Sequence, residues 1–260
     1  MKLLGVNITG EAAEKEWGFT EASLPRYQKG GKTGMLICHG FGGSPSNMRC
    51  LYEKACEMGY SVVMPLLSGH AATLAKLESC TYRDWRRDVD TALDKLLDMG
   101  CEKIYLCGLS MGALLMADLA ERSAGHELVD GLMMICPPVK LKRYLRVSSF
   151  LAPAIPYVLT ADSFNGKPDS EMYFGMATKK LADIEKLSAD VLHHTGGIDC
   201  PVMLVEAEND NRVDPVSYEL LKEHLPEAER VLIKEAPHGI PYSPQAEELC
   251  SVFENFFRGL

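Results

Sequence analysis

The amino-acid sequence predicts an α/β fold in which a mostly parallel, twisted sheet is flanked by helices and carries a small cap insertion. Short apolar runs alternate with segments that have apolar residues at helical spacing, which is the pattern of βαβ units in a parallel sheet. A proline-rich stretch interrupts this alternation. The core domain is therefore expected to comprise residues 1–137 and 195–260, and the insertion residues 138–194. A chain of 260 residues is long enough for one such domain.

The first expected strand–helix unit shows how the element boundaries are set. Residues 35–39 form an apolar run that is typical of a buried strand. Ser44 can cap the helix that follows, and Pro45 can be its first residue because that position needs no N–H donor. The helix is expected to continue to about residue 58, where Gly59 ends it.

The same signals place the remaining elements. Further strands are expected over residues 61–64, 103–109, 129–135, 201–206 and 230–234. Further helices are expected over residues 82–99, 111–123, 215–224 and from 246 to about 257. The first of these helices rests on apolar residues that recur at helical spacing, namely Trp85, Val89, Leu93, Leu96 and Leu97. Between residues 137 and 195 only short helices and loops are expected, because strand alternation is absent there.

The strongest chemical signal is the sequence Gly108-Leu109-Ser110-Met111-Gly112, which lies between an expected strand and an expected helix. A nucleophilic serine at such a tight turn has strained backbone angles, and glycines two residues away on either side avoid collisions with it. The N-terminus of the following helix stabilises negative charge that develops near the serine. Ser110 is therefore the candidate nucleophile. A serine that merely caps an ordinary helix is the alternative interpretation.

A serine nucleophile needs a base and a group that orients the base. His238 follows the last expected strand, so its imidazole could reach the end of another strand. Asp210 follows the strand expected over 201–206, and a carboxylate there could hold the imidazole tautomer that accepts the serine proton. Asp214 is the rival carboxylate, but its place directly before Pro215 is more typical of a helix cap.

An acyl-transfer site also needs hydrogen-bond donors for the oxyanion. The sequence His39-Gly40-Phe41-Gly42-Gly43 follows the first clear strand. The expected donors are the backbone N–H groups of Phe41 and of Met111, the residue after the candidate nucleophile. The spacing of these glycines does not match a dinucleotide-binding loop. His39 and His70 are expected to be structural and to hold loops near the site by hydrogen bonds.

Charge and composition exclude several classes of function. The formal net charge of −9 disfavours nucleic-acid binding, because a negative surface repels the phosphate backbone. No apolar run approaches the length of a membrane span, and residues 1–10 lack a signal-like apolar core. The nine cysteines show no zinc-ligand spacing and suit a reducing compartment. We therefore expect a cytoplasmic protein with no metal, no organic cofactor, no nucleic-acid partner and no stable membrane insertion.

Several motifs together resemble one known family. They are H-G-F-G-G-S-P, G-H at residues 69–70, Y-R-D-W-R-R-D-V, C-G-L-S-M-G, E-N-D-N-R-V-D-P and P-H-G. The sequence is similar in these motifs to small bacterial carboxylesterases and monoacylglycerol lipases of the α/β-hydrolase superfamily, over about residues 35–257. Two positions depart from the family pattern: Ala71 stands for the last glycine of G-H-G, and Ala113 stands for the last glycine of G-x-S-x-G-G.

The resemblance implies an α/β-hydrolase fold and a role for each candidate residue. It implies Ser110, Asp210 and His238 as the catalytic triad, which occur along the chain in the order of this superfamily. It also implies Phe41 and Met111 as the residues whose amides form the oxyanion hole. Residues from 138 to about 194 would form the cap over the acyl pocket.

The expected reaction is the hydrolysis of carboxylic esters of a small-molecule substrate through an acyl-enzyme. Aromatic and aliphatic residues of the insertion favour an apolar acyl pocket, and hence short- to medium-chain acyl esters or monoacylglycerols. Burial of the same residues against the core domain is the other interpretation. A thioesterase, a C–C bond hydrolase and an aminopeptidase remain open, since each would use the same triad. A non-catalytic scaffold that binds a small ligand is the hypothesis from another class, because fold alone does not fix function.

Overall fold

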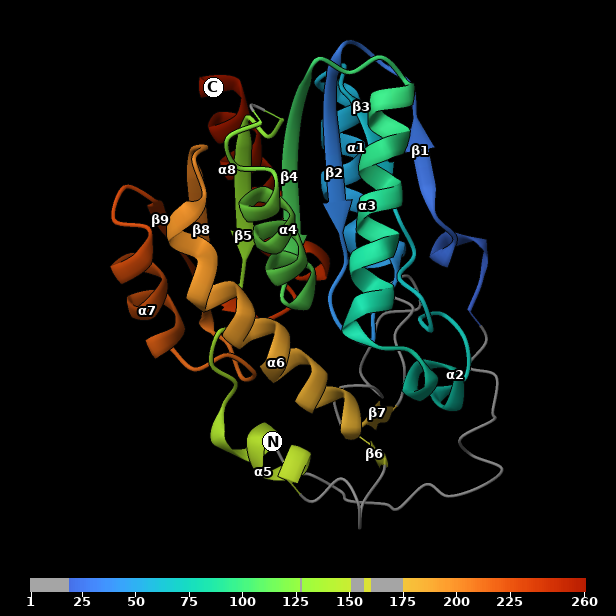
Figure 1. Cartoon of the computed structure of the whole chain (residues 1–260), viewed down its shortest axis with the longest axis vertical. Coiled ribbons are helices and arrows are strands. Elements are labelled where there is room, and N and C mark those ends of the chain that lie inside the picture. The colour runs from blue at the N-terminus through green and yellow to red at the C-terminus, as the bar shows by residue number, and fades with distance from the viewer. Residues whose placement is uncertain (1–18, 127, 151–156, 160–174) are drawn as a thin grey trace.

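A computed structural model describes residues 19–126, 128–150, 157–159 and 175–260. Within these residues the main sheet has seven strands in the order β1-β3-β2-β4-β5-β8-β9, and β1 alone is antiparallel to its neighbour (Figure 1). Its strands are β1 Arg26–Gln28, β2 Thr33–Cys38, β3 Ser61–Met64, β4 Lys103–Leu109, β5 Gly131–Ile135, β8 Val202–Asn209 and β9 Glu229–Pro237. The prediction of a mostly parallel α/β sheet is therefore confirmed.

The helices cover both faces of this sheet, except that α2 and α5 lie beyond the ends of its strands (Figure 1). They are α1 Arg49–Glu57, α2 Leu74–Ser79, α3 Tyr82–Asp98, α4 Met111–Arg122, α5 Arg143–Phe150, α6 Lys179–His194, α7 Val216–His224 and α8 Ala246–Gly259. α3 and α4 pack on one face, and α1 and α8 pack together on the other. A separate pair of short antiparallel strands, β6 Tyr157–Leu159 and β7 Gly175–Ala177, belongs to the expected insertion.

Most expected boundaries lie within a few residues of those observed, and the differences have local causes. The first helix begins as a 3-10 turn, Pro45–Met48, in which the Asn47 side chain accepts the Ser44 backbone N–H at 2.9 Å. On α3, Trp85 is fully buried, but Leu97 is 40% exposed. The helix expected over residues 82–99 is confirmed as α3, and Leu97 lies outside its buried face.

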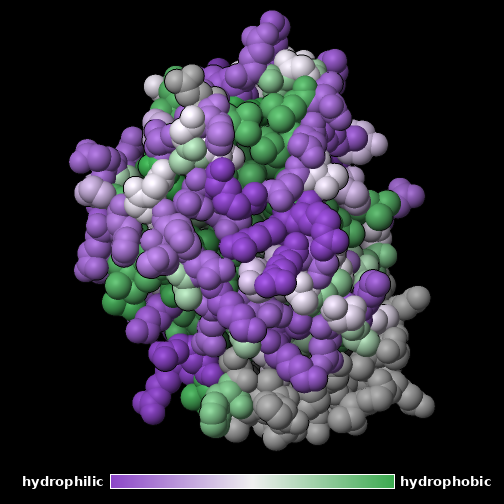
Figure 2. Space-filling view, viewed as in Figure 1, coloured by the Kyte–Doolittle hydropathy of each residue, from purple (hydrophilic) through white to green (hydrophobic). Residues whose placement is uncertain are grey.

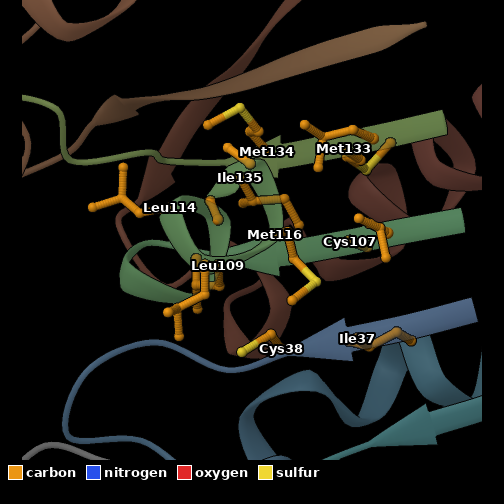
Figure 3. Close-up of a cluster of buried hydrophobic side chains, with 14 of the residues drawn as sticks. Ile37, Cys38, Cys107, Leu109, Leu114, Met116, Met133, Met134 and Ile135 are labelled. Atoms are coloured by element: carbon orange, nitrogen blue, oxygen red, sulfur yellow. The ribbon is translucent and has the colours of Figure 1, made fainter. Parts of the chain in front are cut away.

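The core at the centre of the sheet consists mainly of aliphatic and sulfur-containing side chains. β2, β4 and β5 are buried along almost their whole length, and they contribute Ile37, Cys107 and Met133 to the cluster in Figure 3. Helix α4 closes the cluster with Leu114 and Met116, both of which are fully buried. Burial of apolar area of this kind is the dominant stabilising contribution to a fold. It fixes the strand ends from which the candidate site is built.

Helix α6 differs from the expectation of short helices and loops between residues 137 and 195. It has 16 residues and buries Leu181, Ile184, Leu187 and Val191. These residues have helical spacing, which is a signal that the sequence carried. α6 packs against α4, and its Asp190 lies 3.5 Å from the Arg86 guanidinium of α3.

Charged side chains join the helices on this face of the molecule. Arg86 and Arg122 both contact the carboxylate of Asp118, which is only 6% exposed. Arg122 also contacts Asp90, at 2.8 Å. Figure 2 accordingly shows hydrophilic side chains across much of the face that carries α3, α4 and α6. Because the buried carboxylate is paired with two guanidiniums, its burial is compatible with a stable fold.

Two further expectations concern membranes and cysteines. None of the helices in the described residues has both the length and the hydropathy needed to cross a membrane. All nine cysteines lie in the described residues and are free thiols. Cys38, Cys107 and Cys136, which lie in or directly after buried strands, are fully buried. Residues 1–10, for which no signal-like apolar core is expected, lie outside the described residues.

Candidate active site

Ser110 lies between the last residue of β4 and the first residue of α4, as the sequence predicted. Its backbone has a φ of +55°, in the left-handed region that residues other than glycine rarely adopt. A Cβ atom at Gly108 would collide with the backbone of Gly112, and one at Gly112 would collide with the carbonyl groups of Cys38 and His39. The two glycines are therefore required by the close approach of backbone at this turn.

His238 and Asp210 meet at the same edge of the sheet. Asp210 follows β8 and His238 follows β9, and these two strands are parallel neighbours. Nδ1 of His238 lies 2.8 Å from Oδ2 of Asp210, with the side chains 5% and 7% exposed. The other carboxylate oxygen, Oδ1, accepts the backbone N–H groups of Arg212 at 2.7 Å and Val213 at 2.9 Å. The carboxylate is thus held in one orientation by three donors.

These contacts also set the charge of the Asp210 carboxyl. Burial alone raises its pKa, but the neighbouring His238 and the hydrogen bonds from His238, Val213 and Arg212 outweigh that effect and lower the pKa to about 2. Asp210 is therefore ionised at neutral pH and can only accept hydrogen bonds. The proton of a neutral His238 ring then lies on Nδ1, which leaves Nε2 as an acceptor.

The rival carboxylate, Asp214, has different partners. Its Oδ1 accepts the backbone N–H of Val216, the first residue of α7, at 3.2 Å. Its own N–H donates to the carbonyl of Lys140 at 2.8 Å. Asp214 therefore holds the start of α7, in agreement with the helix-start interpretation, and Asp210 is the aspartate that contacts His238.

Ser110 and His238 line one small cavity, and Phe41 lies in its wall. The cavity wall also includes Arg212 and Tyr242, which were not predicted from the sequence. Arg212 could have been considered, since it is two residues from Asp210, whereas nothing in the pattern around Tyr242 pointed to the site. Met111 is fully buried and is not among the residues that line this cavity.

The two expected oxyanion donors lie in different kinds of segment, one at the start of a helix and the other in the glycine-rich turn after β2. Met111 is the first residue of α4, so its backbone N–H has no acceptor within the helix. Phe41 lies in the turn that follows β2. The Met111 amide therefore lies at a helix N-terminus, a position that favours binding of an anion.

His39 holds the loops behind this turn, so its expected structural role is confirmed. Its Nδ1 lies 2.9 Å from the carbonyl of Gly40, while its Nε2 accepts the backbone N–H of Leu67 at 3.1 Å. Burial lowers the His39 pKa to about 4, although the hydrogen bond to Gly40 acts in the opposite direction. The ring is therefore neutral at pH 7. His70 packs edge-on against Phe41, with the ring centres 5.9 Å apart.

One group of side chains in the described residues has the composition of a metal site. Ligand atoms of Cys136, Asp210 and His238 all lie within 4.8 Å of one another. However, Asp210 and His238 already share a hydrogen bond, and burial raises the pKa of the Cys136 thiol well above its ordinary value. Since a metal requires the thiolate, this arrangement fits a hydrogen-bonded group better than a metal centre.

Residues 31–245 match the family model described as serine aminopeptidase, S33. The chain belongs to the S33 serine aminopeptidase family. A thermostable monoacylglycerol lipase from Bacillus sp. strain H-257 is 27% identical to this S33 chain over 212 residues, 81% of this chain and 83% of the relative. A carboxylesterase from Bacillus subtilis strain 168 is 26% identical over 200 residues, 74% of this chain and 78% of that protein.

A solved structure has the same fold as this S33 chain. A metagenome-derived lipolytic enzyme of the LipS and LipT pair superimposes with a TM-score of 0.82 at 24% identity, and the match covers 92% of this chain and 99% of the other. At that identity the likeness shows the fold, which is that of the α/β hydrolases. The expected resemblance to small bacterial carboxylesterases and monoacylglycerol lipases is confirmed.

The left-handed backbone at Ser110 leads to a prediction about stability. Strain of this kind costs about 1–3 kcal/mol, and glycine relieves it. Both Ser110→Gly and Ser110→Ala lack the hydroxyl, but only the glycine variant relieves the strain. We therefore expect the free energy of unfolding of Ser110→Gly to be about 1 kcal/mol higher than that of Ser110→Ala, and its Tm to be roughly 2–4 °C higher. Thermal and urea unfolding of the two variants measure the difference.

A matched pair at Ser251, an exposed residue inside helix α8, provides the control. There the order should be reversed, with Ser251→Gly about 1 kcal/mol less stable than Ser251→Ala, because glycine disfavours helix. If Ser110→Gly and Ser110→Ala unfolded at the same temperature, the strain at Ser110 would carry no net energy.

Proposed function

We propose that this chain is a carboxylic ester hydrolase with Ser110 as nucleophile, His238 as general base and Asp210 as the residue that orients His238. The observation that carries the proposal is the buried 2.8 Å hydrogen bond between His238 and an ionised Asp210, at a cavity that Ser110 also lines. The relatives named monoacylglycerol lipase and carboxylesterase support an ester as the substrate.

In this proposal the reaction proceeds through an acyl-enzyme. Oγ of Ser110 attacks the ester carbonyl while Nε2 of His238 takes the serine proton, and Asp210 stabilises the resulting imidazolium. The backbone N–H groups of Phe41 and Met111 bind the oxyanion. His238 then gives the proton to the departing alcohol. A water molecule, deprotonated by the same imidazole, attacks the acyl-enzyme, which releases the acid and restores the Ser110 hydroxyl.

The proposed substrates are short- to medium-chain acyl esters, including monoacylglycerols, and residues 138–194 are proposed to form the cap over the acyl pocket. Support comes from the attachment of this insertion to the site: Leu141 forms a β-bridge with Val213, close to Asp210. Several apolar residues considered for the pocket lie outside the described residues, namely Leu151, Ile155, Phe164, Tyr173 and Phe174. Phe150, another apolar residue of the insertion, is 84% exposed and so does not pack against the described core.

The cellular setting is proposed on chemical grounds. We propose a cytoplasmic enzyme whose partner is a small-molecule ester and which binds neither nucleic acid nor membrane as a stable partner. Nine free cysteines suit a reducing compartment, and the net charge of −9 disfavours binding to nucleic acids and anionic membranes.

An aminopeptidase is the second candidate, because the family model carries that name. Its substrate has a positively charged amino terminus, which a site recognises with carboxylates. None of the described residues that line the cavity is acidic, and Arg212 contributes a positive charge there. This arrangement favours an ester over a peptide with a free amino terminus.

A fluorophosphonate probe and a substrate panel test the proposal. The probe should form one adduct, and peptide mapping should place it on Ser110. With the acyl group held constant, an ester should be cleaved faster than the corresponding thioester and amide. Absence of an adduct on folded protein, or an adduct on another residue, would rule out the proposed nucleophile. Faster cleavage of the amide would favour the peptidase.

A further inference from the structure

Arg212 places a cation without a carboxylate partner in the wall of the cavity that contains Ser110 and His238. The residue is half-buried and lines this cavity. Within the described part of the chain, no carboxylate lies within salt-bridge distance of its guanidinium. By contrast, Arg86 and Arg122 each contact two carboxylates.

The backbone that carries Arg212 is held firmly in place. Lys142 donates its backbone N–H to the carbonyl of Arg212 at 2.9 Å and its ammonium to the carbonyl of Asp210 at 2.6 Å. The hydroxyl of Tyr144 donates to the carbonyl of Asn211 at 2.8 Å. Together with the N–H that Arg212 donates to Asp210, these bonds fix the position from which the guanidinium extends.

A half-buried charge is costly unless a partner of opposite sign is supplied. The chain has nine more acidic than basic side chains, yet none of the described carboxylates pairs with this guanidinium. A guanidinium forms paired hydrogen bonds with a carboxylate or a phosphate, and these are stronger than bonds between neutral groups. An anionic group of the substrate would supply the missing partner.

We propose that Arg212 is a specificity-determining residue that selects esters carrying a carboxylate or phosphate near the scissile bond. This inference rests on the proposed ester hydrolysis at Ser110, and within that function it predicts that anionic esters are preferred over neutral ones such as monoacylglycerols. The anion belongs either to the acyl group or to the alcohol, and the experiment has one arm for each source.

The first arm compares the 4-nitrophenyl monoester of glutaric acid with 4-nitrophenyl 5-methylhexanoate, in which an isopropyl group replaces the carboxylate. The second arm compares decanoylglycerol phosphate with decanoylglycerol, below the concentration at which either forms micelles. The measured quantity in each arm is the ratio of kcat/KM for the anionic ester to kcat/KM for the neutral one. Taking a ratio cancels any general effect of a variant on the catalytic residues.

In at least one arm, the Arg212→Gln variant should lower this ratio about 10- to 100-fold, the range expected for a lost hydrogen bond to a charged group. Arg212→Lys should lower the ratio less than Arg212→Gln does, because the charge remains while the paired hydrogen-bond geometry is lost. Arg87→Gln, which removes the same charge from an exposed position on α3, should leave the ratio unchanged.

The outcomes separate this inference from the proposed function. If neutral esters are cleaved and a fluorophosphonate labels Ser110, but Arg212→Gln leaves the ratio unchanged in both arms, Arg212 does not select anions and the proposed function stands. An equal fall in Arg87→Gln would show a general effect of charge and would also overturn the inference. If neither ester of either pair is cleaved and Ser110 is not labelled, both proposals fail.

Discussion

Replacement of Ser110 by alanine is expected to lower kcat for a short 4-nitrophenyl ester by about 10⁴- to 10⁶-fold, the loss seen when a nucleophile is removed from a triad. The variant has no atom that can form the acyl-enzyme. The oxyanion donors and the cavity stay in place, so that some hydrolysis above the background rate should remain. Steady-state kinetics with purified variant and parent measure the effect.

A control is needed because a change at a strained turn could also disturb the fold. Ser243→Ala provides it, since Ser243 follows the cavity residue Tyr242, but within the described residues its hydroxyl bonds to Ile240 and Gln245. That variant should keep kcat within a few-fold of the parent. A Ser110→Ala protein that unfolds like the parent and hydrolyses the ester at the parent rate would exclude a Ser110 acyl-enzyme.

Replacement of Asp210 by asparagine is expected to lower kcat by about 10³- to 10⁴-fold. An amide group directed at Nδ1 of His238 would donate a hydrogen bond, which favours the ring tautomer with its proton on Nε2. In that tautomer the imidazole can no longer accept the serine proton. Asp214→Asn is the matched control, because Asp214 bonds to the backbone of Val216 rather than to His238, and it should change kcat by less than about tenfold.

Acid stability provides a second measurement on the Asp210→Asn variant. The pKa of Asp210 is about 2 in the folded chain, compared with 3.8 for an unperturbed aspartate. The ionised group therefore stabilises the fold at pH above about 3.8, and this contribution is lost as the pH falls through 2. Urea unfolding at pH 7 and at pH 3 should show a smaller pH dependence for Asp210→Asn than for the parent. Two results would argue against the assigned role of Asp210. One is the same pH dependence of unfolding in Asp210→Asn and the parent, and the other is the same kcat in Asp210→Asn and Asp214→Asn.

The contact between two of the candidate residues could be expected from the sequence because they follow neighbouring strands. The carboxyl ends of parallel neighbouring strands meet at one edge of the sheet, so Asp210 after β8 and His238 after β9 were expected to meet. The glycines beside Ser110 carried their own evidence, since a tight strand–helix turn restricts the residues that fit. The choice of Asp210 over Asp214 rested on helix-cap preference, and the structure gives each aspartate the expected partner.

Other features depended on contacts that sequence periodicity does not encode. The antiparallel strand β1 has three residues, which is too short for its alternation to be read. Helix α6 had the spacing of a buried face, but the proline-rich stretch before it made the whole region look irregular. The position of Arg212 in the cavity wall depends on the course of the loop after Asp210, and that course is fixed by hydrogen bonds to residues about 70 positions earlier in the chain.

Those hydrogen bonds have a consequence for how the molecule can be altered. The carbonyls of Asp210, Asn211 and Arg212 are all anchored to Lys142 and Tyr144, at the point where the chain leaves the core. A rigid-body swing of α5 would pull directly on the aspartate that holds the imidazole. Any chimera that carries a foreign insertion must therefore reproduce these anchors in its opening turn, even if everything beyond that turn is exchanged.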